Sequence, residues 1–362
     1  MTEIPSTDGI EGDLLAKAFA STTASYKITL AKSIFAHVAL GGGEFLPYAK
    51  LLEGMLRVLW HPVTAYRLRL GHYDRSAEYF AGLSDDQLSG SFEEALPFID
   101  CAVRNPNATI LRFPVGVFLK PWFEAAGARS GEPDRPAFHT VTRDRNRGFY
   151  LPYEIHPDGI LLDRGFMDYI LRNLPLLEGW TDMRLVDYLQ ARNPNIPGIP
   201  LKLRAPERST LGPQRGWWAQ LLRAEGFRCI YTGRELGPDG FHLDHFLPWR
   251  FVAHDRIWNL VPAAPEINLT KGARIPDPSL VPSLAEAHLH AVRRATETDM
   301  PGKDFLDEYL DDLGIEPAML RDRDAFVRGY QDTVVPLLTL ARRRFPSWSP
   351  PAPPPPLFHA RP

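Results

Sequence analysis

Cysteine is scarce in this sequence. The 362 residues include only Cys101 and Cys229. Two cysteines in a chain of this length do not make a disulfide framework, and they suit a reducing compartment. We therefore expect a cytoplasmic protein that folds around a hydrophobic core.

Long hydrophobic runs are also missing. No stretch reaches the roughly 18 apolar residues that a membrane-spanning helix needs, so no membrane partner is expected. Residues 1–20 are acidic and polar, without a basic start followed by an apolar run. This pattern argues against a secretory signal peptide.

The chain lacks an excess of positive charge. Its net charge is −3, with 23% charged and 44% hydrophobic residues. Such a chain has no overall attraction to nucleic acid, so any basic surface must be local. Residues 192–234 hold a local excess, with two acids against eight bases: Arg192, Lys202, Arg204, Arg208, Arg215, Arg223, Arg228 and Arg234. This segment is either a solvated connector or a surface that contacts phosphates.

Length and composition predict two or three domains. The residues between 193 and 200 are rich in proline and asparagine, which indicates a boundary. We expect a mainly α protein with a small α+β insert. Its predicted segments are a polar start (1–21), a helical N-terminal domain (22–192), a central ββα domain with a basic lead-in (193–282), a helical C-terminal region (283–348) and a proline-rich tail (349–362).

Hydrophobic periodicity predicts the local structure of the N-terminal domain. Helices are expected over residues 25–38 and 44–60, and again over 165–177 and 182–190. Residues 127–148 are charged and rich in turn formers, so an exposed loop or a loose hairpin is expected there. Strand-like pieces flank a turn signal at residues 157–159.

An acid and a histidine stand side by side in residues 241–248, at the end of an apolar segment. Asp244 and His245 are followed by Asn259, Asn268 and Lys271. We expect residues 241–246 to form the second strand of a hairpin that closes near residues 237–240. A helix over residues 265–272 should then cross the hairpin and return Asn268 to the strand end.

These residue types match the needs of metal-assisted phosphodiester cleavage. A histidine that titrates near neutral pH can take a proton from water. A carboxylate and an amide oxygen are hard ligands that suit Mg²⁺ or Mn²⁺. The residues alone leave two alternatives open for the Asp244–His245 pair, which are a polar strand end without chemistry and a zinc site.

Residues 228–276 resemble the HNH endonuclease superfamily, whose ββα-metal domain carries this pattern. The spacing from Asp244–His245 to Asn259, Asn268 and Lys271 is similar to that of the HNH domain in RNA-guided CRISPR nucleases. The resemblance implies that Asp244 and Asn268 bind the metal and that His245 is the general base. It also implies that Asn259 ties a loop to the strands and that Lys271 lies close to a phosphate.

The sequence departs from many relatives in its cysteines. Their two Cys-x-x-Cys knuckles are missing here, because Cys229 is followed three residues later by Thr232. No structural zinc is therefore expected. His242 and Arg250 are further candidates for phosphate contacts, although a packed or surface role suits His242 equally well.

The resemblance implies a metal-dependent endonuclease that hydrolyses DNA. Two alternatives stay open, an RNA-directed or toxin-type nuclease and a nucleic-acid-binding protein with an idle site. Two sets of residues resemble the helical N-terminal regions of bacterial HNH proteins: Ser25, Tyr26 and Lys27, and the later Arg192, Asn193 and Pro194 with Lys202. That likeness suggests a restriction-like or phage-defence setting, with a second copy of the chain or a defence protein as a partner.

Overall fold

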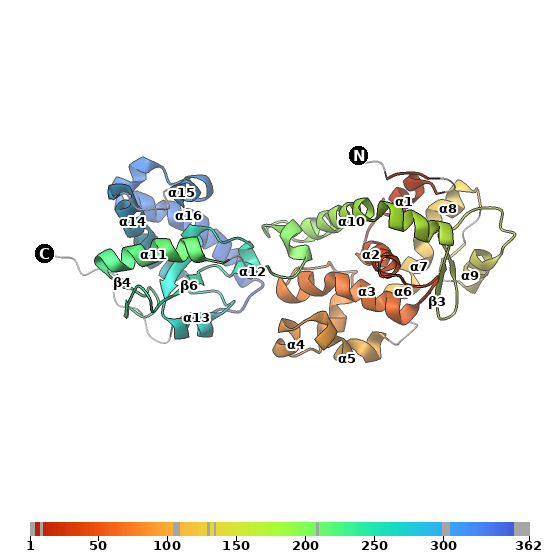
Figure 1. The fold of residues 1–362 in the computed structure, drawn as a ribbon, viewed down its shortest axis with the longest axis horizontal. Coiled ribbons are helices and arrows are strands. Elements are labelled where there is room, and N and C mark those ends of the chain that lie inside the picture. Colours follow the sequence, from red (N-terminus) through yellow and green to blue (C-terminus); the bar gives the residue numbers. More distant parts are fainter. Residues whose placement is uncertain are drawn as a thin grey trace. The chain divides into compact units, whose positions relative to one another are not determined.

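A computed structural model describes residues 4–7, 10–103, 109–128, 131–133, 135–207, 210–298 and 305–350. The chain divides into two compact units (Figure 1). The N-terminal unit holds residues 1–194 and 199–206, and the C-terminal unit holds residues 195–198 and 207–362. The domain limits expected from the sequence remain predictions. Most of the expected proline-rich tail, from residue 351 onward, lies outside the described residues.

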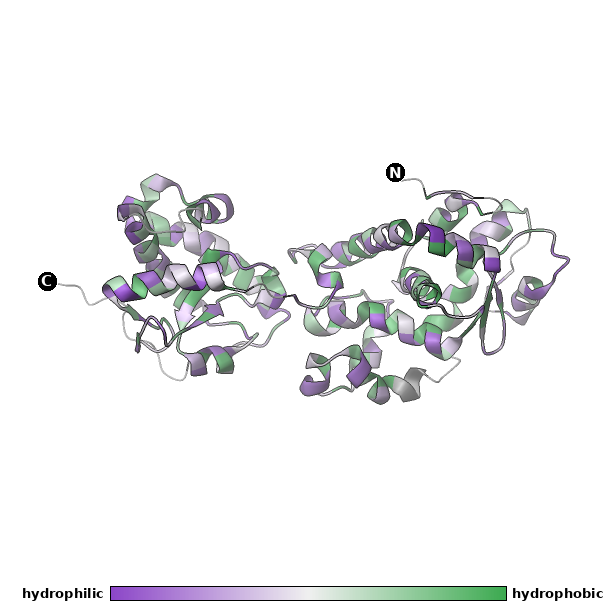
Figure 2. Cartoon of the chain, in the orientation of Figure 1, coloured by the Kyte–Doolittle hydropathy of each residue, from purple (hydrophilic) through white to green (hydrophobic). Residues whose placement is uncertain are grey.

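The N-terminal unit is built around a helix that is hydrophobic on most of its sides. This helix, α2, places Ile28, Leu30, Ile34 and Phe35 in the core, and Figure 2 shows it nearly end-on. The elements of the unit are α1 (Gly12–Ala18), α2 (Tyr26–Ala39), β1 (Phe45–Pro47), α3 (Tyr48–Trp60), η1 (His61–Ala65), η2 (Ser76–Phe80), α4 (Asp85–Ser89), α5 (Phe92–Val103), α6 (Thr109–Arg112), α7 (Pro114–Val117), α8 (Lys120–Ala125), α9 (Pro136–Arg143), β2 (Tyr153–Ile155), β3 (Gly159–Leu162), α10 (Arg164–Arg192) and η3 (Ile199–Leu203).

A three-stranded antiparallel sheet closes one end of this unit, in the order β1-β3-β2. The turn signal at residues 157–159 does join two strands, β2 and β3. The helix expected over residues 44–60 begins only at Tyr48. Residues Phe45–Pro47 form β1 instead, because their alternating exposed and buried side chains match the period of a strand that pairs with β3.

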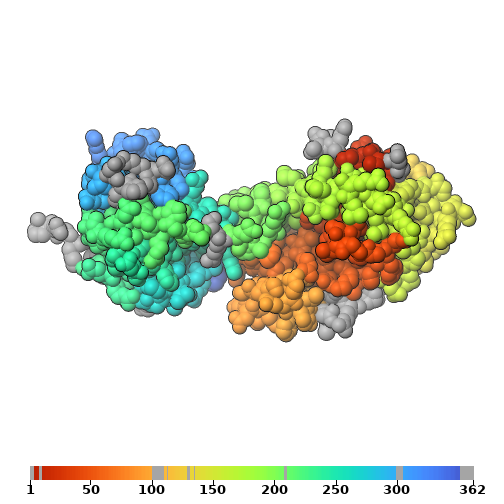
Figure 3. Space-filling view, in the orientation of Figure 1, coloured from red at the N-terminus to blue at the C-terminus, as the bar shows by residue number. Residues whose placement is uncertain are grey.

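Two other expectations for this unit were wrong. The helices expected over residues 165–177 and 182–190 are one continuous helix, α10. Pro175 and Gly179 inside that helix cost about 3 and about 1 kcal/mol, and packing of α10 along α2 outweighs these costs. Figure 3 shows α10 in yellow-green beside the red-orange surface of the earlier helices. Residues 127–148 contain the helix α9, which has a proline at its first position.

The C-terminal unit surrounds two short antiparallel ladders with helices (Figure 1). Residues Ile275 and Ser347 form a parallel bridge that ties the end of the described chain to the centre of the unit. The elements are α11 (Gly212–Glu225), β4 (Phe227–Arg228), β5 (Glu235–Leu236), β6 (His242–His245), α12 (Trp249–Val252), η4 (Ile257–Asn259), β7 (Leu260–Ala263), α13 (Pro265–Lys271), η5 (Pro278–Leu280), α14 (Val281–Glu297), α15 (Phe305–Leu313), η6 (Pro317–Arg321) and α16 (Arg323–Arg342).

The hairpin expected to close near residues 237–240 does not form. The strand β4 pairs with β5, so that hairpin closes over residues 229–234. The strand β6 pairs with β7, which follows it in the sequence. All four residues of β7 are buried, so this strand offers β6 an apolar partner that the short β5 cannot provide.

The mainly helical architecture with small sheets is confirmed. Within the residues that the structure describes, none of the helices is long and apolar enough to cross a membrane.

A buried histidine makes the C-terminal unit sensitive to acid. His288 on α14 packs among the rings of Trp218, Tyr309 and Tyr330, and its Nδ1 lies 2.7 Å from the Tyr309 hydroxyl. Burial lowers the pKa of His288 from 6.5 to about 3. The folded protein therefore keeps this ring neutral at pH values where the unfolded chain protonates it.

We expect acid to destabilise the protein through His288. Because its folded pKa lies below its unfolded pKa, this contribution is complete above pH 6.5 and is lost as the pH falls toward about 3. Between pH 7 and pH 5 the loss is about 2 kcal/mol. Urea denaturation at both pH values should show a smaller loss for His288→Phe than for the wild type. Equal losses would show that His288 is not the responsible group.

Candidate active site

The acid and the histidine lie on β6, the strand at the centre of the C-terminal unit. Asp244 is opposite Val261 and His245 is opposite Leu260 on β7. The helix α13 follows β7 after Ala264, with a proline at its first position and a glycine in the left-handed region just after its end. It packs against β6, as expected from the sequence. Two strands and one helix thus form a ββα unit.

Asp244 is the centre of a buried polar network. Its side chain is 2% exposed, and those of Tyr231 and Lys271 are inaccessible. The Tyr231 hydroxyl donates to Oδ2 of Asp244 at 2.5 Å. The Lys271 ammonium lies 3.1 Å from Oδ1 and 3.0 Å from Oδ2, and it also donates to the His245 carbonyl at 2.6 Å. The carboxylate and the ammonium therefore neutralise each other out of contact with water.

Two pKa shifts describe this network. Burial lowers the pKa of Lys271, and the neighbouring Asp244 carboxylate opposes that shift. Burial, followed by the charge of Asp244, raises the pKa of Tyr231 well above its ordinary value of 10.0. Tyr231 therefore stays a neutral donor to Asp244 over the physiological pH range.

His245 is held by an acid that the sequence reasoning missed. Its Nε2 lies 2.7 Å from Oδ1 of Asp255, and the two side chains are only 12% and 16% exposed. An ionised carboxylate only accepts hydrogen bonds, so Nε2 carries a proton, and in the neutral ring the lone pair is therefore on Nδ1. Asp255 lies in the loop between α12 and η4, and nothing in its spacing distinguishes it from other surface acids.

The loop that carries Asp255 is supported by the C-terminal helices. The Ile257 amide donates to Glu308 at 2.5 Å, and the Trp258 indole donates to Asp312 at 2.7 Å, both on α15. From α16, the Tyr330 hydroxyl donates to the Trp258 carbonyl. His254, beside Asp255, has its pKa lowered to about 4, mainly by burial, so it is neutral at physiological pH.

Asn259 fixes the other end of this loop. Its Nδ2 donates to the Leu247 carbonyl at 2.9 Å, and its Oδ1 accepts from the Leu247 amide at 2.8 Å. Its own carbonyl accepts from the Phe246 amide at 2.9 Å. These bonds connect the end of β6 with the start of β7. Asn259 therefore acts on the loop and does not join the Asp244 network.

Asn268 and His242 lie together near the surface. Nδ2 of Asn268 on α13 is 3.5 Å from Nδ1 of His242, which is exposed on β6. His242 is two residues before Asp244, so the two side chains share a strand face. Arg250 lies half-buried on α12. The structure thus joins Asp244 to Lys271, links Lys271 to the backbone carbonyl of His245, and places His242 with Asn268.

Asp244 and Asn268 supply oxygen donors of the kind that a hard divalent cation prefers. A carboxylate offers about four lone-pair positions, and Lys271 and Tyr231 use three of those on Asp244. The amide oxygen of Asn268 accepts no hydrogen bond from any described residue. Within the described chain, no three His, Cys, Asp or Glu side chains cluster as a metal site. Mg²⁺ commonly uses one or two carboxylates with water and phosphate oxygens, which agrees with this sparse donor set.

A protein-family model described as HNH endonuclease matches residues 229–277. The chain contains an HNH endonuclease domain. The match begins just after β4 and covers β5, the β6–β7 ladder and α13, with helices on both sides. This domain indicates nuclease activity on nucleic acid, and its family generally uses a divalent metal. No curated protein and no solved structure matches the chain.

The HNH domain should depend strongly on Asn259 for its stability. Asn259→Ala leaves the amide and the carbonyl of Leu247 buried without partners, at about 1–3 kcal/mol for each group. We expect the free energy of unfolding to fall by about 2–4 kcal/mol in urea denaturation. The matched control Asn268→Ala, at a partly exposed position, should change it by about 0.5 kcal/mol or less. Equal effects at the two asparagines would contradict the loop-fixing role.

Proposed function

We propose that this protein is a metal-dependent endonuclease that hydrolyses phosphodiester bonds in DNA. The observation that carries this proposal is the hydrogen bond between His245 and Asp255, one residue along β6 from Asp244. It leaves Nδ1 of the neutral His245 ring with a lone pair, in the residue next to Asp244 and inside a domain that matches HNH endonucleases. A base next to a hard ligand is the equipment for activating water at a phosphate.

His245 is the proposed general base. With its Nε2 proton donated to Asp255, its Nδ1 takes a proton from the attacking water. Asp255 is a positioning residue, because it selects the ring tautomer and stabilises the imidazolium that forms. Supports on α15 and α16 hold the loop of Asp255 in place.

Asp244 and Asn268 are the proposed ligands of Mg²⁺ or Mn²⁺. When bound, such a cation stabilises negative charge on the phosphate and on the leaving 3′ oxygen. Lys271 offsets the charge of Asp244, which would otherwise be buried alone. The contact between Lys271 and a phosphate stays a prediction, because the ammonium is buried against Asp244 in this structure.

His242 and Arg250 are the proposed phosphate contacts of the domain. The basic run at residues 192–234 contributes less to phosphate binding than its charge suggests. Lys202 is buried in the N-terminal unit, and Arg215 donates to the Phe241 and Asp239 carbonyls. Much of this run therefore serves the fold.

Plasmid nicking tests the proposal directly. With Mg²⁺ or Mn²⁺, the wild type should nick supercoiled DNA, and EDTA should abolish the activity. His245→Ala should lower the rate by about 10²-fold or more, because a general base contributes that much. His37→Ala is the matched control, because His37 lies in the N-terminal unit, where its ring hydrogen bonds the Gly43 carbonyl. This variant should cleave as the wild type does.

Matched RNA substrates belong in the same assay. Faster cleavage of RNA than of DNA would overturn the assignment of DNA as the substrate. Equal nicking by the wild type and His245→Ala would refute His245 as the base. A wild type that leaves both substrates intact with either metal would leave the idle-site alternative standing.

Asp255→Asn tests the positioning role separately from binding. An amide can donate to Nε2, so the ring would be held in the tautomer that places the proton on Nδ1. We expect kcat to fall by about tenfold or more, while KM for DNA changes by less than about twofold. Asp255→Glu should recover part of the rate. A change confined to KM would assign Asp255 to substrate binding instead.

A further inference from the structure

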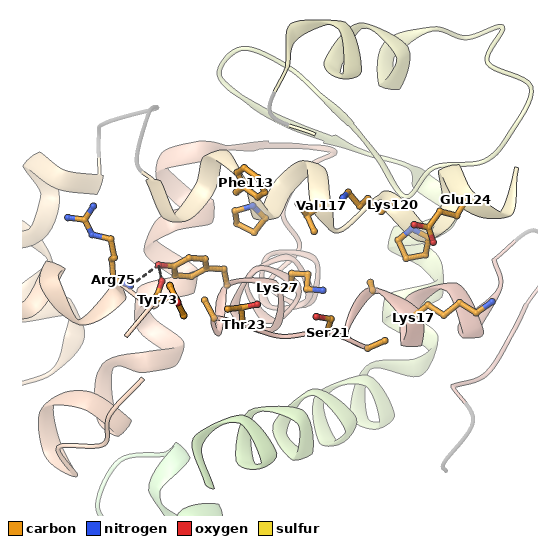
Figure 4. A pocket seen from close by; sticks show the side chains of 16 residues that line it. Lys17, Ser21, Thr23, Lys27, Tyr73, Arg75, Phe113, Val117, Lys120 and Glu124 are labelled. Carbon is orange, nitrogen blue, oxygen red and sulfur yellow. Dashed lines mark hydrogen bonds between the residues drawn. The ribbon is translucent and has the colours of Figure 1, made fainter. Parts of the chain in front are cut away.

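A pocket of about 870 Å³ lies in the N-terminal unit, and no residue of the HNH domain is among its lining residues (Figure 4). Its walls come from α1, the start of α2, residues 73 and 75, α7 and α8. Protein pockets for small ligands are commonly about 300–1,000 Å³ in volume. The pocket is therefore large enough for a nucleotide, and nothing in the proposed nuclease mechanism uses it.

Three lysines line this pocket without a charged partner. Lys17 on α1, Lys27 on α2 and Lys120 on α8 make no ion pair with any described residue, and Glu124 is the acid in the lining. Figure 4 shows Lys27 and Lys120 converging on the middle of the pocket. Burial lowers the pKa of Lys27, and Lys120 lowers it further by charge repulsion. A bound anion would relieve that repulsion.

Aromatic side chains line the pocket beside these lysines. Phe113 and Tyr73 are 56% and 70% exposed, so both rings are accessible to a ligand in the pocket. The Tyr26 hydroxyl accepts from the Arg75 amide at 2.7 Å and donates to the Tyr73 carbonyl at 3.2 Å. These bonds, drawn in Figure 4, fix the segment that carries Tyr73.

The lysine-bearing end of α2 is held rigidly. The Ser25 amide and hydroxyl both donate to Asp74, at 2.8 Å and 2.6 Å, and Tyr188 donates to the same carboxylate. Arg192 donates to the Thr23 carbonyl at 3.0 Å. This buried support fixes the residues that come just before Lys27.

We propose that this pocket binds a nucleoside phosphate, with its phosphate at Lys27 and Lys120 and its base against Phe113 and Tyr73. Ammonium groups bind phosphate oxygens through strong charge-assisted hydrogen bonds. Aromatic faces accept any base by stacking. A free nucleotide and the 5′-phosphorylated end of a single strand offer the same two groups. The site belongs to the N-terminal unit, so it stands independently of the proposed nuclease function.

Binding of two probes to the full chain tests this site. ATP and a short 5′-phosphorylated oligothymidylate would be titrated by calorimetry in EDTA, so that no cleavage interferes. We expect one site per chain in the wild type. The double variant Lys27→Gln/Lys120→Gln should weaken binding by about tenfold or more. The matched control Lys50→Gln, at an exposed lysine paired with Glu53, should bind as the wild type does.

Phe113→Ala separates a nucleotide site from a simple anion site. It should weaken the binding of ATP and leave that of inorganic phosphate unchanged, because only a base stacks on the ring. Tighter binding of the oligothymidylate than of ATP would identify a strand end as the natural ligand, and the reverse would identify a free nucleotide. Absence of binding by both probes, or equal binding by the double variant and Lys50→Gln, would refute the site whether or not plasmid is cleaved.

Discussion

The buried ion pair between Asp244 and Lys271 is the constraint on which the HNH domain depends. Both side chains are almost inaccessible to water, so each charge requires the other. Breaking such a pair by removing one partner typically costs about 3–5 kcal/mol. Because Asp244 belongs to β6 and Lys271 to the end of α13, the pair fixes the helix on the strand. Tyr231 and the His245 carbonyl take up further hydrogen bonds of the pair, so little polar capacity is left unmet.

That fixed contact determines where the other site residues lie. Asn268 is three residues before Lys271, so it lies on the same face of α13 and reaches the His242 end of β6. His245 follows Asp244 and turns to the opposite side of the strand, where Asp255 meets it. The loop of Asp255 is in turn braced by α15 and α16. The C-terminal helices are therefore part of the positioning of the proposed base.

Local signals in the sequence predicted the parts of this site that are close in the chain. The Asp244–His245 pair, the helix α13 and the mainly helical fold could all be read from spacing and periodicity. The pairing of β6 with β7 could not be read from the sequence. A turn-rich segment before β6 predicted a different hairpin, and Pro262 weakened the signal for a strand at β7. Asp255 was missed because its contact with His245 depends on the conformation of the loop between α12 and η4, which spacing in the sequence does not predict. The burial of Lys271 was missed because lysine is almost never fully buried unless it is paired.

The same ion pair also limits the electrostatic attraction of the metal-free HNH domain for nucleic acid. Asp244 and Lys271 cancel each other, so without a divalent cation they give the site no net attraction for a polyanion. Addition of a cation at Asp244 would change the local charge by two units and would favour a phosphate in the same place. The net charge of −3 gives the chain as a whole no compensating attraction. Any attraction of the metal-free chain for a polyanion must therefore come from local groups of positive charge, and Lys17, Lys27 and Lys120 form such a group in the N-terminal unit.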